Sequence, residues 1–221
     1  MLSPLSFVPV FGKVYENADV WFNFGLIDKA PIFDQVIQDW DAKMSTDPSN
    51  EKFQAFELGL NTSSNDGSMA GKLSYYSTTW SDRIQTKTVV NLDGDDDIVY
   101  LTGIGQVHSG IELEFAAQIS PLVRIDLGLG LGSWEYTKDP NGTYRDGDTD
   151  LTYAYALNGL NVGDMPQTGI ALGLTLTPIQ GLSIQTTTYN ADASQGDVDW
   201  KKNIDGSSST LNVRQKPRNI D

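Results

Sequence analysis

The stretch VRIDLGLGL, residues 123–131, places an apolar side chain at every odd position and a polar residue or glycine at every even position. Successive side chains of a strand point to opposite sides, so a period of two predicts a strand with one apolar face. Just upstream, IELEFAAQI (residues 111–119) alternates in the same way, and Ser120-Pro121 between the two runs predicts a tight turn. The two runs therefore predict a β-hairpin.

Working outward, the same alternation predicts further strands on both sides of this hairpin. A second hairpin is expected from residues 170–176 and 182–188, joined by a turn at 178–181. Toward the N-terminus, strands are expected at 20–26, at 53–61 and, less regularly, at 72–83. Residues 7–14 are apolar on both faces and contain Pro9, which favours an edge strand. About eight strands are thus predicted.

The connections alternate between short and long. Short turns are expected at 15–19, 62–69, 120–122 and 178–181, whereas long polar stretches occupy 28–50, 85–97, 138–165 and the chain beyond 191. In an antiparallel meander, alternate connections lie at opposite ends of the sheet, and transmembrane barrels have short turns at one end and long loops at the other. The predicted fold is an all-β, antiparallel up-and-down meander, a partial transmembrane β-barrel spanning residues 1–191, followed by a polar loop or tail at 192–221. In the first long stretch, Pro31 to Trp40 predicts one short amphipathic helix that packs locally.

Composition excludes several classes of protein. The 221 residues include 29 acidic and 15 basic side chains, a net charge of −14, which argues against nucleic acid as a partner. With no cysteine, the chain has neither disulfides nor thiolate ligands. No apolar run is long enough for a membrane helix, and the mean hydropathy is −0.30. The first residues do not resemble a secretory signal, so any export signal is expected to be missing from this sequence.

Catalytic chemistry is not predicted. The chain has a single histidine, His108, and none of the common nucleophile, metalloprotease or phosphate-loop motifs, so it is not expected to be an enzyme or to need a cofactor or metal. His108 is interpreted as a structural or inward-facing residue rather than a ligand. The acidic runs 93–97 and 146–150 are interpreted as solvated turns rather than calcium sites, because the second run has Leu157 where an EF-hand needs glutamate.

Several segments, in order, resemble the later barrel strands of TonB-dependent outer-membrane receptors, especially those typical of Bacteroidetes. They are ADVWFNFGLIDKAPIFDQV, NEKFQAFELGLNTSS, KLSYYSTTWSDRI, YLTGIGQVHSGIELEF, LGLGSWEYTKD and VGDMPQTGIALGLTL, and the resemblance covers about residues 19–191. It implies a 22-stranded barrel with a plugged lumen, in the outer membrane of a Gram-negative bacterium. Such receptors use a TonB complex to import a siderophore, cobalamin or glycan.

The chain departs from that family pattern, since it has room for about eight strands and shows no plug, TonB box or terminal aromatic strand. A fragment is therefore expected, surrounded by outer-membrane lipid, whose parent contacts the TonB complex through a plug region missing here. The candidate ligand residues lie on the even, lumen-facing register of the strand at 123–131 or just beyond it: Arg124, Asp126, Trp134 and Tyr136. The two aromatic residues fit equally well as a stacking surface for a sugar or siderophore and as rim residues that pack against loops.

Two rival interpretations remain open. A complete eight-stranded outer-membrane barrel, acting as an adhesin or pore, would require the first and last strands to pair. A secreted carbohydrate-binding β-sandwich would bury the odd face of residues 123–131 in a core and leave the protein soluble without detergent.

Overall fold

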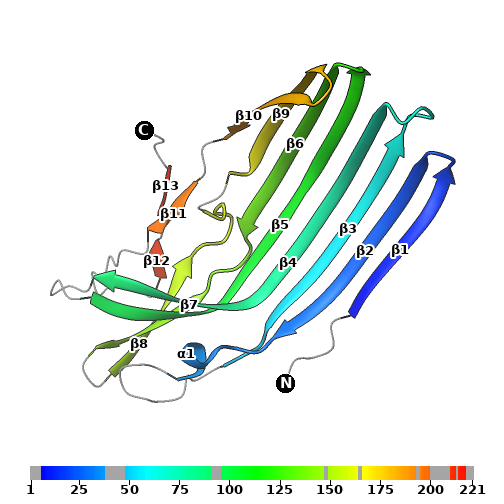
Figure 1. Ribbon diagram of the computed structural model, residues 1–221. Coiled ribbons are helices and arrows are strands. Elements are labelled where there is room, and N and C mark those ends of the chain that lie inside the picture. Colours follow the sequence, from blue (N-terminus) through cyan, green and yellow to red (C-terminus); the bar gives the residue numbers. More distant parts are fainter. Residues whose placement is uncertain are drawn as a thin grey trace.

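The computed structural model describes residues 6–37, 48–90, 96–146, 149–163, 166–192, 195–199, 210–212 and 214–217. Its main feature is one antiparallel wall in which eight strands follow each other in chain order (Figure 1). The strands of the wall are β1 (Ser6–Tyr15), β2 (Ala18–Lys29), β3 (Glu51–Ser63), β4 (Met69–Val90), β5 (Asp96–Ser120), β6 (Val123–Tyr136), β9 (Thr168–Ile179) and β10 (Leu182–Ala191). The eight strands predicted from alternation are thereby confirmed.

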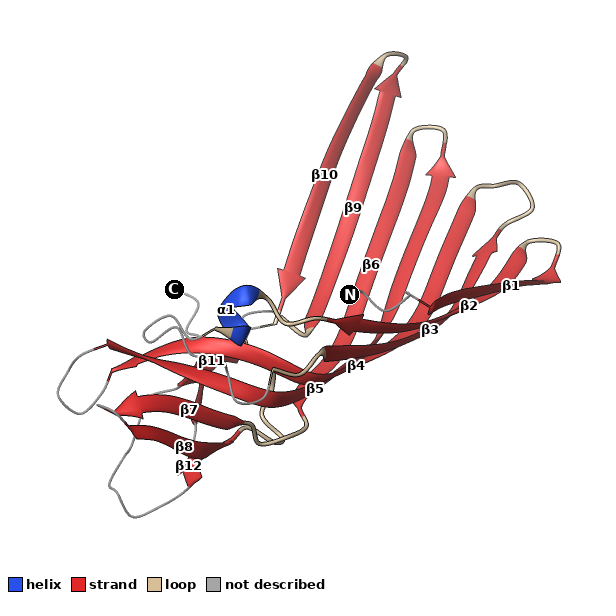
Figure 2. Ribbon diagram, turned by 90° about the horizontal axis from the view of Figure 1, so that it is seen from below, coloured by secondary structure: helices blue, strands red, loops and turns tan. Residues whose placement is uncertain are grey.

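The predicted asymmetry of the two ends is also confirmed. The turns β1–β2, β3–β4, β5–β6 and β9–β10 lie together at one end of the wall, and the long connections lie at the other (Figure 1). Seen from below, the wall is strongly curved rather than flat (Figure 2). It does not close, because β1 and β10 stand at opposite ends of the strand order and do not pair with each other. The complete eight-stranded barrel is therefore wrong for the described residues.

The two faces of the wall differ in chemistry. Rows of directly opposed residues cross the strands, and one face carries an almost unbroken apolar row, made by Val20, Leu60, Leu73, Leu113, Leu129 and Ile170. The neighbouring row on the other face is polar or small, and consists of Asn61, Lys72, Glu114, Gly128, Ala171 and Tyr189. We call these the apolar face and the polar face. No second sheet covers the apolar face among the described residues, which contradicts the sandwich.

Strands β4 and β5 change register near the end of the wall. The pairing shifts between Trp80 and Arg83 and again before Gln85, so each strand carries one extra residue. Asp82 has φ 56° and Gly103 φ 75°, a left-handed backbone that aspartate tolerates better than most residues and glycine adopts freely. Such bulges bend a strand and interrupt its alternation. The bulges disturb only the end of the stretch 72–83, because the pairing is regular as far as Trp80. Before the bulge, Ser77 and Thr79 share the face of Leu73, which makes the alternation less clean.

Beyond the bulges the structure corrects two sequence predictions. Residues 85–97 were expected to form a loop, but β4 and β5 continue as a hairpin to Val90 and Asp96, where β-branched residues such as Val89 and Ile98 favour a strand. The stretch 138–165 contains the hairpin of β7 (Asn141–Asp146) and β8 (Thr149–Ala156), and β7 pairs with β5. We call this hairpin with the β4–β5 extension the head.

The head holds most of the buried hydrophobic core of the described chain. The buried side chains here are Ile84, Val99, Tyr100, Leu101, Ile104 and Tyr155 of the head, together with Tyr136 at the end of β6 and Leu157 just after β8. The wall is a single layer, so it has no second surface against which to bury side chains. The head therefore supplies the compact packing that the wall lacks.

The remaining elements are short. The helix α1 (Phe33–Val36) follows Pro31 as predicted, but the side chains of Ile32 and Phe33 are 53% and 72% exposed, so the expected local packing is wrong for them. Trp40, the acidic residues 93–95 and residues 147–148 lie outside the described residues. In the predicted tail, β11 (Gln195–Asp199) pairs with β13 (Arg214–Pro217), and β12 (Thr210–Asn212) pairs with β8. No helix in the described ranges is long and apolar enough to cross a membrane.

Candidate functional site

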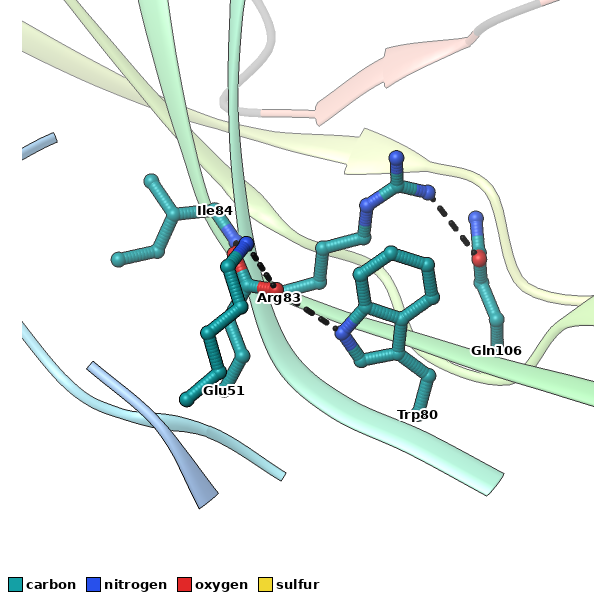
Figure 3. Close-up of polar contacts among 6 residues, drawn as sticks. Glu51, Trp80, Arg83, Ile84 and Gln106 are labelled. Carbon is teal, nitrogen blue, oxygen red and sulfur yellow. Dashed lines mark hydrogen bonds and ion pairs between the residues drawn. The ribbon is translucent and has the colours of Figure 1, made fainter. Parts of the chain in front are cut away.

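A buried carboxylate organises the wall where the long connections begin. Glu51, the first residue of β3, has a side chain that is only 1% exposed, and its Oε2 accepts hydrogen bonds from Lys29 Nζ at 3.3 Å and Trp80 Nε1 at 3.1 Å (Figure 3). The backbone N–H of Ile84 donates to Oε1 at 3.5 Å. A buried charge is tolerated when it is paired and hydrogen-bonded in this way. Glu51 thereby ties β2, β3 and β4 together and fixes the indole of Trp80.

Contacts continue from Trp80 to β5. The Arg83 guanidinium lies 4.0 Å from the centroid of the Trp80 ring, a cation–π contact, and Arg83 Nη1 donates to Gln106 Oε1 at 3.2 Å (Figure 3). On the other side, Phe53 packs on Trp80 with ring centroids 4.4 Å apart. The bulge makes this possible, because the extra residue keeps Arg83 on the same face as Trp80.

The network reaches β6 through His108 and Trp134. His108 Nε2 lies 3.3 Å from Gln106 Oε1, and its ring stacks on the Trp134 indole with centroids 5.3 Å apart and planes 15° from parallel. Trp134 Nε1 donates to the Tyr76 hydroxyl at 2.9 Å. Gln167 fixes the backbone of Trp134 from both sides, since its Oε1 accepts from the Trp134 N–H and its Nε2 donates to the Trp134 carbonyl, each at 3.1 Å.

Two hollows open on the polar face beside this network. The larger, about 530 Å³, is bordered mainly by aromatic and carboxylate side chains, including Trp21, Glu57, Trp80 and His108. The smaller, about 240 Å³, has a floor of glycine and alanine with Gln167 and Tyr189 at its sides. Three residues line both hollows, namely Tyr76, Glu112 and Trp134. We call this neighbouring pair the trough.

Glycines make room for the aromatic rings of the trough. A Cβ at Gly110 would lie 2.7 Å from the Tyr76 hydroxyl, so only glycine lets this ring cross the sheet surface. A Cβ at Gly130, by contrast, would have no atom within 4 Å. The space next to Gly130 is therefore empty, and a side chain at this position would point into it.

The structure brings some of the predicted site residues together and separates others. Arg124 and Asp126 form an ion pair, with Nη2 and Oδ1 2.7 Å apart, and both border a third hollow of about 510 Å³ nearer the short turns. Trp134 lies in the trough. Tyr136 is only 5% exposed, so it has little surface to offer a ligand. The ligand roles of all four remain predictions.

Sequence reasoning missed several residues of the site, chiefly Glu51, Tyr76, Trp80 and Gln106. The signal for two of them was available, because Tyr76 and Trp80 share the even register of Lys72 and so the polar face. The described residues contain no group of three or more histidine or acidic side chains arranged to hold a metal ion.

Comparisons with known proteins agree with this architecture. The family of TonB-dependent receptor-like β-barrels matches residues 5–216. Among solved structures, FpvA of P. aeruginosa bound to heterologous pyoverdines is 13% identical with a TM-score of 0.57, over 86% of this chain and 23% of that one. The copper transporter OprC is 12% identical with a TM-score of 0.51, over 84% of this chain and 33% of that one.

These similarities show a shared fold, and the chain spans 23% of the FpvA chain and 33% of the OprC chain. No curated protein matches the chain. The family match covers nearly all of the sequence, from residue 5 to residue 216, and agrees with the antiparallel, unclosed wall. The chain therefore belongs to the TonB-dependent receptor family and forms part of its β-barrel.

Proposed function

We propose that this chain is part of the wall of an outer-membrane importer and has no catalytic role. Members of its family are receptors in the outer membrane of Gram-negative bacteria. The observation that carries the proposal is the exposed apolar face, where Leu73, Ile170 and Leu172 are 47%, 46% and 53% exposed although they lie in the middle of strands. An apolar surface of this extent needs a lipid environment or another partner.

The limits of the apolar face also support a membrane. At the end toward the long connections it finishes with aromatic side chains, and Phe56 contacts both Phe22 and Tyr75 with ring centroids 5.2 and 6.0 Å apart. Phe56 lies directly opposite Ser77, and the same row continues through Ser109 and Ser133, so the apolar band gives way to serines at this level. Aromatic residues flank the apolar band of transmembrane barrels at the interface with water.

In this arrangement the polar face lines the lumen, the short turns lie in the periplasm and the head lies outside the cell. The cargo is a small ligand such as a siderophore, cobalamin or an oligosaccharide, and energy comes from a TonB complex acting through a plug region of the parent protein. The similarity of the fold to FpvA and OprC supports transport in general.

Protease treatment of intact cells that carry the protein tests the orientation. Cleavage is expected in the connections at residues 91–95 or 147–148, which belong to the end with the long connections. The turns at Asn65 and Pro121 should be cut only after the outer membrane is permeabilised. Cleavage of those turns in intact cells, with the long connections protected, would invert the topology, and a protein absent from the outer-membrane fraction would contradict the proposal altogether.

A further inference from the structure

We propose that the trough binds a neutral, hydroxyl-rich chain, that is, an oligosaccharide, with Trp134 as the surface on which a sugar ring stacks. This inference rests on the import function proposed above and names the ligand class of the same lumen. It starts from the two neighbouring hollows, of about 530 and 240 Å³, which share the lining residues Tyr76, Glu112 and Trp134.

The indole of Trp134 is held in place before any ligand arrives. His108 stacks on it, its Nε1 donates to Tyr76, and Gln167 binds its backbone on both sides. His108 and Trp134 both border the larger hollow, whereas only Trp134 of these two residues borders the smaller one. A ligand in the smaller hollow would therefore meet the indole without the histidine ring beside it. A rigid ring loses little conformational entropy on binding, which is the advantage of a preorganised contact surface.

The charges around the trough disfavour an anionic ligand. Lys72 is the single lysine or arginine among the described residues that line it, and Lys72 Nζ already pairs with Glu114 Oε1 at 3.3 Å. The carboxylates of Glu57 and Glu112 also face the trough. Glu57 accepts from Asn23 at 3.1 Å, and Glu112 is exposed. An anion would thus meet carboxylates and no free cation.

A pyranose ring fits this combination of groups. One side of the ring presents C–H groups that pack on an indole. Its edge carries hydroxyl groups that donate hydrogen bonds to carboxylates, and an ionised carboxylate has acceptors and no donor. Binding sites of this type combine apolar and aromatic walls with a few polar groups that fix orientation. Trp134 supplies the apolar wall and Glu112 the acceptor, and both border the two hollows.

The open floor at Gly130 provides a test that does not disturb the protein. Gly130 lies in β6, a Cβ there meets no atom within 4 Å, and valine favours strands, so Gly130→Val should assemble normally while it fills the trough. Gly12→Val is the matched control. Gly12 also lies in a strand with no atom within 4 Å of its Cβ, but it pairs with Val20 on the apolar face, far from the trough.

The parent barrel protein that contains this chain would be refolded into lipid nanodiscs and titrated with maltohexaose, cellohexaose and mannohexaose, with tryptophan fluorescence and calorimetry as readouts. We expect at least one saccharide to bind, Gly130→Val to weaken that binding by roughly tenfold or more, and Gly12→Val to bind like the wild type. Circular dichroism would confirm equal strand content in the three proteins.

Absence of saccharide binding, or equal binding by Gly130→Val, would overturn the inference. Binding of ferric citrate but of no saccharide would show that the ligand is an anionic chelate. The proposal of import would then stand, and the proposal of a saccharide ligand would be wrong. Binding of a neutral unstructured peptide alone would assign the trough to a polypeptide. Failure of the wild-type parent protein to enter lipid would instead count against the proposed function.

Discussion

Replacing Leu127 by arginine tests which face of the wall meets lipid. Leu127 lies in the middle of β6 on the apolar face, between its register partners Phe115 and Leu172. It is five positions beyond Leu122 at the short turn, which at about 3.3 Å per residue and a tilt of about 40° places it roughly 13 Å from that end. The apolar band of a barrel is about 25 Å tall, so Leu127 is near its middle.

The magnitude follows from this depth. An arginine at the midplane of a barrel costs about 2–4 kcal/mol, whereas near the interface the cost falls to about 0–1 kcal/mol. Ser133 lies on the same face in the row of Phe56 and Ser77, where the apolar band ends, so Ser133→Arg should be nearly neutral. Gly128→Ser should also be mild, because Gly128 lies on the polar face and a Cβ there would make an ordinary contact, 3.6 Å from Ala171 Cβ.

The assay uses the parent barrel protein that contains this chain, refolded into phospholipid vesicles across a urea series and followed by heat-modifiable migration on gels. Leu127→Arg should lower the urea concentration at the midpoint of unfolding or prevent insertion, and the other two variants should behave like the wild type. If Leu127→Arg assembled normally while Gly128→Ser failed, the two faces would be reversed and the membrane assignment of β6 would be wrong.

Three further outcomes are expected. Without detergent or lipid the chain should aggregate because of its apolar face and unpaired strand edges, and a monodisperse monomer in light scattering would contradict the lipid-facing assignment. In urea titrations, Glu51→Gln should lower the free energy of unfolding by about 1–3 kcal/mol, because Glu51 is buried against Lys29 and Trp80. As a control, Lys52→Ala removes an exposed ion pair to Asp82 at 3.8 Å and should change the free energy of unfolding by less than about 0.5 kcal/mol. In the β3–β4 turn, hydrogen bonds from Ser64 and Ser68 lower the pKa of Asp66 from 3.8 to about 2. The stabilising effect of the Asp66 carboxylate should therefore be complete above pH 3.8 and lost as the pH falls through 2. An NMR titration of Asp66 should show this midpoint and Ser64→Ala should raise it, whereas an ordinary midpoint in the wild type would refute the turn geometry.

The alternation of apolar and polar residues was sufficient to predict the wall, because each wall strand has one apolar face and a short turn joins the two strands of each hairpin. The runs at 111–119 and 123–131 pair in the structure with the register that the turn at Pro121 implies. The strand prediction was wrong where the two-residue alternation is interrupted. The bulges at Asp82 and Gly103 reverse the parity of β4 and β5, so the strand beyond them looked like a polar loop.

The head was unpredictable for a different reason. Ile104 of β5 and Leu157, which follows β8, are both fully buried, and no local sequence pattern predicts the burial of two residues so far apart in the chain. In the site, register parity correctly placed Arg124, Asp126 and Trp134 on the polar face. It could not reveal that Glu51 is buried, because Glu51 follows a long connection and resembles an ordinary charged residue at the start of a strand.

The position of the β7–β8 hairpin between β6 and β9 also bears on the order in which the wall assembles. Every other wall strand pairs with the strand that follows it in sequence, whereas β9 reaches β6 across residues 137–167. A hairpin that forms early within this stretch shortens the effective loop and lowers the entropy lost when its ends meet. Assembly is therefore expected to proceed hairpin by hairpin from β1 to β6, with the docking of β7–β8 as the step that brings β9 and β10 into place and limits the folding rate.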